Sequence, residues 1–314
     1  MTDDTPGAVT GAPAGAGALG IGDLAAMTGV PVRTIRFYCD EGLLVPARSA
    51  GGHRRFDAAA ADQLRLVRRL RGLGLGLPAI ASVLAGERSI GEAAAAERAA
   101  LDVELASLAW RRAALRAVEE AAPAERAARL ELLAAAADGS AAREVLAGFW
   151  RRLVLVPLPA EFVFSFVDAS APPPPADPAP EQVLAYAEMV TLVSDRSLAR
   201  RLLARGRANV ERVGDEPTLL TGLGEAIEMA VPLVVAGRAP EPGRALDHFV
   251  DAHAAGRGAK DTPGFRRELL PGVAVDGDPR LRRYWRLHRE VTGQPATVGE
   301  ALIWLGDALA RSVA

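Results

Sequence analysis

The feature that most constrains the fold is a pair of short helical segments, at residues 20–40, separated by a glycine and a proline. The first segment, "GIGDLAAMT", ends at Gly29, and the second begins at Pro31. Glycine ends helices because it adopts the left-handed backbone of a C-cap, and proline suits the first turn because its missing N–H costs nothing there. Two short helices joined by such a tight turn predict a helix-turn-helix.

The second of these helices has two different faces. Its apolar face carries Val32, Ile35 and Cys39, whereas the opposite face carries Arg33, Arg36, Phe37 and Asp40. Arginine can pair with guanine or hold phosphates, so this polar face suits the major groove of DNA. Taken alone, the pattern fits an ordinary amphipathic surface helix equally well.

The next segment, "LLVPARSAGGHRRFD", predicts a β-hairpin with Gly51–Gly52 at its tip. Its second strand would carry two adjacent arginines, Arg54 and Arg55, beside the polar helix face. Such a wing would hold neighbouring phosphates and contribute affinity and register rather than base choice.

Charge is unevenly distributed along the chain. The whole sequence has a formal net charge of −2, but residues 19–88 carry ten arginines against six acidic residues, a net +4. Residues 89–125 carry four arginines against seven acidic residues, a net −3. A basic segment on a near-neutral chain indicates a localised contact with a polyanion, although a solvated charged face has the same composition.

Cysteine content and hydropathy exclude several classes of site. Cys39 is the only cysteine, which excludes intrachain disulfides, cysteine-cluster zinc sites and iron–sulfur clusters. We also find no run of about 18 apolar residues and no signal peptide, so we expect a cytoplasmic protein with no membrane partner.

With these features, residues 19–122 resemble the MerR family of bacterial regulators. The resemblance rests on "IGDLAAMTGVPVRTIRFYCDEGLLVPARSAGGHRRFDAAAADQLRLVRRLRGLGLGLPAIASVLA", which follows the family pattern in order and at matching spacing. The sequence departs from the family pattern at three positions. Pro31 stands where a small polar residue is usual, Cys39 stands where the family often has an acidic residue, and Phe37 stands where it often has a tyrosine. These departures leave the operator sequence open.

The resemblance implies a role for each residue. In or beside the major groove it places Arg33, Thr34, Arg36, Phe37 and Tyr38. In the wing contact it places Arg54, Arg55 and Phe56, with Arg48 and His53 as lesser candidates. It also implies that the helices at residues 58–72 and 77–84 pack against the reading head. For the first of these we expect a buried stripe of Leu66, Leu70 and Leu73.

A long helix at residues 90–122 follows, stopped before Pro123. An a/d seam over about two heptads is formed by Leu101, Leu105, Leu108 and Leu115. Isolated seams of this length are often plain helix packing. The family resemblance instead implies an antiparallel coiled coil that makes a homodimer, with two reading heads facing a pseudo-palindromic operator in double-stranded promoter DNA. The family also implies distortion of that DNA so that RNA polymerase engages the promoter.

The expected fold is therefore mainly α. The expected parts are a disordered tail (1–18), a winged helix-turn-helix domain (19–88), a dimerisation helix (89–122) and a helical effector-binding or interaction bundle (123–314). Within the bundle we expect a proline-rich loop from Asp168 to Pro180. The segments "LVLVPL" and "FVFSF" could be short strands or parts of helices.

Three hypotheses remain for the bundle. It binds a small organic, apolar effector; it binds a protein partner or strengthens the dimer; or it is an enzyme domain. We favour a regulator that is not an enzyme, because no catalytic order, phosphate loop or cofactor motif is present. "HFVDAH" suggests a metal site, but its histidines, His248 and His253, are five residues apart and do not align on a helix, so we predict no metal. Aromatics such as Trp150, Tyr284 and Trp304 are interpreted as core.

Overall fold

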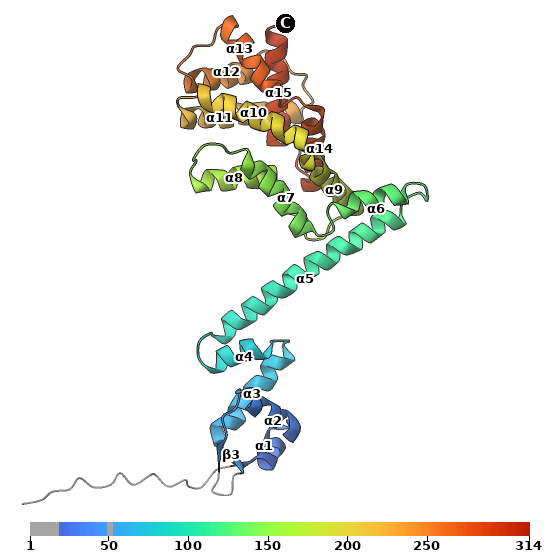
Figure 1. The fold of residues 1–314 in the computed structure, drawn as a ribbon, viewed down its shortest axis with the longest axis vertical. Helices are drawn as coiled ribbons and strands as arrows, with labels where there is room; N and C mark the ends of the chain where they lie inside the picture. The colour runs from blue at the N-terminus through green and yellow to red at the C-terminus, as the bar shows by residue number, and fades with distance from the viewer. Residues whose placement is uncertain (1–18, 49–52) are drawn as a thin grey trace, which may run out of the picture. The chain divides into compact units, whose positions relative to one another are not determined.

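The computed structural model describes residues 19–48 and 53–314, and these are mainly helical, as the sequence predicted (Figure 1). The chain divides into two compact units, Met1–Val103 and Glu104–Ala314. The expected tail at residues 1–18 and the expected hairpin tip at Gly51–Gly52 lie outside the described residues.

The N-terminal unit combines short strands with short helices. In chain order its elements are β1 (Leu19–Gly20), α1 (Ile21–Thr28), α2 (Val32–Asp40), β2 (Ala47–Arg48), β3 (Arg54–Phe56), α3 (Ala58–Gly72) and α4 (Leu77–Leu84). The 30-residue helix α5 (Ile90–Glu119) follows, and the boundary between the two units falls within it.

Local signals explain where these helices begin and end. Gly29 has a φ of 70° and donates its N–H to the Ala25 carbonyl at 2.9 Å, which closes α1 with a left-handed C-cap. Pro31 then precedes the first residue of α2. The Asp57 carboxylate accepts the Ala60 N–H at 2.8 Å and caps α3.

The three strands form one small antiparallel sheet in the order β1-β3-β2. Leu19 pairs with Phe56 and Gly20 with Arg55 on one side of β3. On the other side Ala47 pairs with Arg55 and Arg48 with Arg54. The central strand β3 pairs with β1, which directly precedes α1, and is itself followed by α3, so it ties the starts of these two helices together.

The core of this unit lies where α1, α2, β3 and α3 meet. Its buried members include Leu24, Ile35, Phe56 and Leu64. Of the stripe expected on α3, Leu70 is buried and Leu66 is partly buried, but Leu73 is 67% exposed. The buried side of the helix also contains Leu64 and Val67, which the expected stripe left out.

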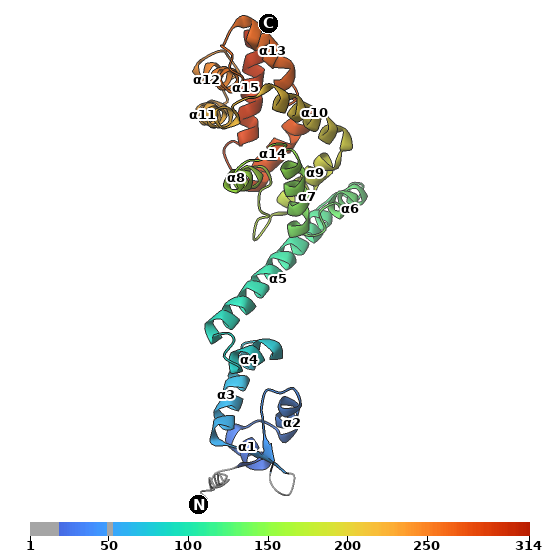
Figure 2. The same ribbon diagram turned by 60° about the vertical axis from the view of Figure 1, so that its left-hand side comes forward.

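The C-terminal unit is helical throughout its regular structure (Figure 2). After α5 its helices are α6 (Arg126–Ala134), α7 (Gly139–Arg152), α8 (Ala160–Ser170), α9 (Pro180–Ser194), α10 (Arg196–Arg212), α11 (Glu216–Val235), α12 (Arg244–Gly256), α13 (Pro263–Val273), α14 (Pro279–Thr292) and α15 (Val298–Ser312). The proline-rich segment is irregular between α8 and α9. "LVLVPL" is also irregular, whereas "FVFSF" is part of α8.

Two apolar clusters hold this unit together. The first joins α5, α7, α9 and α14 around Trp110, Trp150, Tyr186 and Tyr284. The Tyr284 hydroxyl, which is fully buried, donates to the Ser170 carbonyl at 2.6 Å and accepts the Trp150 indole N–H at 2.8 Å. The second cluster joins α11, α12, α13 and α15, which lie side by side in Figures 1 and 2.

Helix α11 meets the length and mean hydropathy of a membrane-spanning segment, with a hydropathy of 1.5. It also carries two carboxylates in its middle, Glu225 and Glu228. Ionised groups at that depth of a bilayer are costly. Since α11 packs against α12 and α15 in the second cluster, we interpret it as a helix of the bundle.

Candidate nucleic-acid interface

Helix α2 is held by its apolar side and presents its other side to solvent. Ile35 is fully buried, and Tyr38 and Cys39 pack partly against the core. Arg33 and Arg36 are exposed, and Phe37 is 46% exposed with its ring 5.9 Å from that of Tyr38. Thr34 and Tyr38 lie between the two sides and are partly buried.

The arginines on this exposed side have no partner within the described residues. Neither Arg33 nor Arg36 makes a hydrogen bond or an ion pair there. Arg55, on β3, is likewise exposed and unpaired among the described residues. These three guanidinium groups are therefore available to a polyanion.

The neighbouring Arg54 is engaged differently. Its Nη2 donates to the Asp40 carboxylate at 2.8 Å, which ties the strand β3 to the last residue of α2. The sequence analysis placed Arg54 together with Arg55 in the wing contact and did not predict this ion pair. The ion pair could have been inferred from Asp40, an acidic residue on the same helix face as Arg33 and Arg36.

Phe56 is not a surface residue. It was expected to join the wing contact, but its side chain is 2% exposed and packs among Leu24, Ile35 and Leu64. Side chains alternate along a strand, so an exposed Arg55 places Phe56 on the core side. The expectation of a DNA contact by Phe56 was therefore wrong, and the residue anchors β3 instead.

The remaining wing candidates are only partly described. His53 is exposed, immediately before β3. Arg48 ends β2 and pairs with Arg54 in the sheet register, but the placement of its side chain lies outside the described structure.

Helix α3 contributes arginines that stabilise the unit. Arg68 donates to the Thr28 carbonyl at 3.1 Å, next to the Gly29 turn that joins α1 and α2. Arg71 donates to the Leu75 carbonyl at 2.8 Å. Both therefore cap backbone carbonyls at the ends of segments, a role that the sequence pattern did not indicate.

The position of Cys39 on the apolar face of the helix suggested that it is buried, but in the structure it is only partly buried. Burial raises the pKa of its thiol, an effect that the nearby Arg54 guanidinium opposes. A raised thiol pKa disfavours the reactive thiolate.

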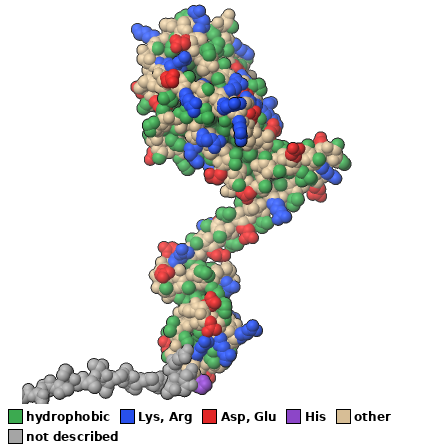
Figure 3. Space-filling model, viewed as in Figure 1, with side chains coloured by type: hydrophobic (Ala, Val, Ile, Leu, Met, Phe, Trp, Pro, Cys, Tyr) green, Lys and Arg blue, Asp and Glu red, His purple; other side chains and the backbone are tan. Residues whose placement is uncertain are grey.

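Figure 3 shows basic side chains gathered on the N-terminal unit beside α2 and β3. A patch of free arginines on a helix and an adjacent strand matches the electrostatic footprint of a phosphate backbone. The exposed helix can meet base edges, and Arg55 can meet phosphates.

A second surface lies on α5. All four leucines of the predicted seam are exposed: Leu101 by 47%, Leu105 by 63%, Leu108 by 53% and Leu115 by 63%. On the other side of the helix Trp110, Ala113 and Ala117 are buried, and the Trp110 indole donates to the Ala136 carbonyl at 2.9 Å. The leucine row is therefore an apolar face that residues 19–48 and 53–314 leave exposed.

The histidines of α12 do not form a metal site. His248 hydrogen-bonds Glu225 at 2.7 Å on the surface, whereas His253 is buried against the ring of Phe249. In residues 19–48 and 53–314 there is no group of three or more His, Cys, Asp or Glu side chains that could hold a metal ion.

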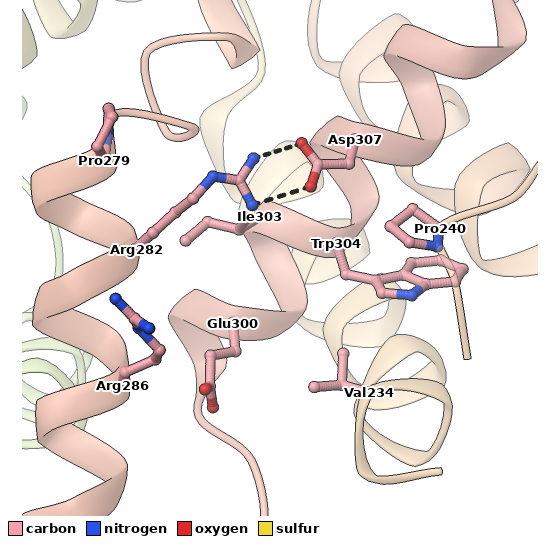
Figure 4. A pocket seen from close by; sticks show the side chains of 9 residues that line it. All are labelled: Val234, Pro240, Pro279, Arg282, Arg286, Glu300, Ile303, Trp304 and Asp307. Atoms are coloured by element: carbon pink, nitrogen blue, oxygen red, sulfur yellow. Dashed lines mark hydrogen bonds and ion pairs between the residues drawn. The ribbon is translucent and has the colours of Figure 1, made fainter. Parts of the chain in front are cut away.

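Several cavities open in the C-terminal unit. One, of about 550 Å³, lies between α14 and α15 and is shown in Figure 4. Arg282 reaches across it to Asp307, and the two make a bidentate ion pair. Another lies between α8, α10, α11 and α12 and has a mostly apolar lining.

Comparisons with known proteins find relatives of the N-terminal unit. Residues 19–87 match the MerR HTH family regulatory proteins. The HTH-type transcriptional activator TipA of Streptomyces coelicolor is 45% identical over 65 residues, which are 20% of this chain and 26% of TipA. The nodulation protein NolA of Bradyrhizobium elkanii is 41% identical over 71 residues, 22% of this chain and 32% of NolA.

A third relative, the HTH-type transcriptional regulator HmrR of Rhizobium leguminosarum bv. viciae, is 37% identical over 67 residues, 21% of this chain and 52% of HmrR. The matched segment thus spans between a quarter and a half of these relatives. No solved structure matches the chain.

The helix-turn-helix, the adjoining antiparallel strands and the free arginines define a nucleic-acid-binding class of domain. Within that class, residues 19–87 are a MerR-family helix-turn-helix domain, as the sequence resemblance predicted.

Proposed function

We propose that this protein is a cytoplasmic, DNA-binding transcriptional regulator of the MerR type. DNA binding is assigned to residues 19–88, dimerisation to 89–122, and effector binding or a protein interaction to 123–314. The observation that carries the proposal is the set of unpaired arginines on α2 and β3, in a domain shared with transcriptional regulators.

In this proposal α2 is the recognition helix and the β2–β3 hairpin is the wing. Arg33 and Arg36 lie one turn apart and reach base edges or flanking phosphates in the major groove, with Thr34, Phe37 and Tyr38 beside them. Arg55 holds a backbone phosphate. The ion pair between Arg54 and Asp40 fixes the wing against the recognition helix.

The exposed leucine row of α5 supports a homodimer. A second copy of α5 would cover Leu101, Leu105, Leu108 and Leu115 in an antiparallel coiled coil. Burial of these half-exposed leucines between two copies would supply the hydrophobic driving force for association. Two-fold symmetry then matches a pseudo-palindromic operator.

Regulation follows from deformation of the bound promoter. A dimer that bends and untwists DNA changes the relative placement of promoter elements, and with it their recognition by RNA polymerase. A small organic effector in the C-terminal unit would bias this deformation. The mainly apolar cavity between α8, α10, α11 and α12 supports a small-molecule effector more than a protein partner.

The test is selection of operator sequences from a random DNA library, followed by fluorescence anisotropy at fixed salt. We expect the selected duplex to bind at least about 10³-fold more tightly than random DNA. The double variant Arg33→Ala, Arg36→Ala should lose this preference. Arg98→Ala, which removes an exposed arginine from α5, is the matched control and should keep it. Equal affinity of the wild-type chain for selected and random DNA would refute the proposal.

A further inference from the structure

One cavity of the C-terminal unit combines an apolar lining with a few polar groups. It has a volume of about 250 Å³ and lies between the irregular segment at residues 153–158, α8, α10, α11 and α12. At about 30 Å³ per water molecule in the liquid, this is the space of roughly eight waters. A ligand of about ten non-hydrogen atoms would fill it.

Most of the lining is aliphatic or aromatic. Its apolar side chains come from the irregular segment and from α8, α10 and α11, and include Leu155, Phe162, Val210, Leu220 and Leu223. Gly206 of α10 lets the loop approach closely, because a Cβ at that position would lie 2.8 Å from the Leu155 side chain. Such a lining favours an apolar ligand body, since burial of apolar area is the main source of affinity here.

Two charged side chains line this cavity, Arg205 and Glu216. Arg205 forms an ion pair with the partly buried Asp276. Glu216 lies in the first turn of α11, where a helix N-terminus favours a carboxylate, but burial raises the pKa of its carboxyl group. An anionic ligand would therefore bury its charge without a free counter-ion, and a cation would lie beside Arg205, so that either charge is costly to bury.

Two uncharged polar groups remain. Asn209 accepts a hydrogen bond from Arg257 through its Oδ1 atom, which leaves its amide N–H groups as donors. His253 also lines the cavity, and its Nδ1 has no hydrogen-bond partner among the described residues. Burial lowers the pKa of His253 to about 3, and the neighbouring Arg257 and Arg205 act in the same direction, so the ring is neutral at physiological pH.

The larger cavity in Figure 4 is less suited to an apolar ligand. Arg282, Arg286, Glu300 and Asp307 all line it, so that four ionisable side chains surround the space. In the 250 Å³ cavity only Arg205 and Glu216 are charged under physiological conditions.

We propose that the cavity between α8, α10, α11 and α12 binds an uncharged, mainly apolar small molecule that carries one hydrogen-bond acceptor, received by the Asn209 amide. This inference rests on the proposed ligand control and specifies its site and ligand class. The cavity lies between the two apolar clusters of the unit, so an occupant would contact helices from both.

The experiment is isothermal titration of the full chain with octan-2-one as the probe, and with octanoate and octylammonium as its charged counterparts. We expect saturable binding of octan-2-one at one site per chain, and at least about tenfold weaker binding of both ions, which corresponds to about 1.4 kcal/mol. Tighter binding of either ion than of the ketone would overturn the assignment of an uncharged ligand.

Variants locate the site. Leu220→Trp fills the cavity and should weaken octan-2-one binding at least about tenfold. Val235→Trp makes a similar change on the same helix at a side chain that is 50% exposed and outside the lining, and it should bind normally. Asn209→Asp removes the amide donor and should also weaken binding; circular dichroism checks that each variant is folded. Unchanged binding by both Leu220→Trp and Asn209→Asp would overturn the site.

This test is separable from that of the regulator. Leu220→Trp without ligand should bind the selected operator as the wild type does, because it changes no residue of α2 or β3. A chain that binds octan-2-one but no specific DNA would refute the regulator and leave the site in place. A chain that binds operator but not octan-2-one would refute the site alone.

Discussion

Arg54 and Arg68 show that part of the positive charge near α2 is already engaged within the protein. Arg54 is paired with Asp40, and Arg68 holds the Thr28 carbonyl beside the helix-turn-helix turn. Arginine count therefore overstates the charge that DNA can use. Among the described side chains of α2 and β3 the free set is smaller, and it separates into two positions on the recognition helix and one on the wing.

This separation predicts different defects for Arg55→Ala and for the helix variants. Loss of Arg55 should weaken operator and random DNA alike and flatten the salt dependence by roughly one unit per lost phosphate contact. Arg33→Ala or Arg36→Ala should instead lower the ratio of operator to random affinity, since a bidentate base contact discriminates by about 1–3 kcal/mol. Salt titrations of each variant on both DNAs measure these effects. Equal loss on both DNAs for all three would leave specificity to Thr34, Phe37 or DNA deformability.

A buried hydroxyl makes a second prediction. Tyr284→Phe would leave both the Trp150 indole N–H and the Ser170 carbonyl without a partner in the core. Each unsatisfied buried group costs about 1–3 kcal/mol, and a unit of this size loses about 2–4 °C in Tm per kcal/mol. Phe164→Leu, at a side chain that is 71% exposed, is the control. A Tyr284→Phe melting curve that overlays the wild type would show that the two groups find other partners.

Among the elements, those of the N-terminal unit were predictable because their boundaries depend on nearby residues. The turn at Gly29 and Pro31, the start of α3 after Asp57 and the extent of α3 all agree with the pattern to within about one residue. Which side of an element is buried was harder. Leucines occur on two sides of α3, so the sequence did not show that Leu64 and Val67 are fully buried whereas Leu66 and Leu73 are not.

Helix α5 carries the prediction about assembly. Leu105 and Leu108 are exposed in the single chain, so the double change to Glu should not disturb its fold. In a dimer the four introduced carboxylates would be buried in the seam, and we expect monomers by light scattering. Leu130→Glu, at a leucine of α6 that is 58% exposed, is the matched control and should stay dimeric. A dimer that survives the double change would place the interface elsewhere.

For the molecule as a whole, the contacts that build the C-terminal unit are the part that sequence patterns could not supply. Trp150 and Tyr284 are 134 positions apart, and the cavity proposed as the ligand site draws on residues 153–253. Proline lies at the start of several helices of this unit, as Pro180 does in α9 and Pro279 in α14, although Pro271 lies within α13. Which helices pack together depends on long-range contacts that no local pattern encodes.

Two buried histidines give this unit a predictable response to acid. Burial lowers the pKa of His253 to about 3 and that of His288 to about 4. An unfolded chain would bind protons at both near pH 6.5, so between pH 6.5 and 4 the unfolded state binds more protons than the folded state. Burial raises the pKa of Asp276, and that carboxyl acts in the opposite direction.

The contribution of these two histidines to the free energy of unfolding should therefore be constant above pH 6.5. Below pH 6.5 this contribution should fall as the pH drops. By pH 5 the loss should be about 2 kcal/mol for each histidine. Urea unfolding of the wild type and of the double variant His253→Gln, His288→Gln at pH 7, 6 and 5 measures this contribution as a difference, in which Asp276 and the other carboxyls cancel. The wild type should lose more stability than the variant over this range. Parallel pH dependences would show that the two rings gain their protons in the folded state as easily as in the unfolded chain, and hence that they are not held neutral by burial.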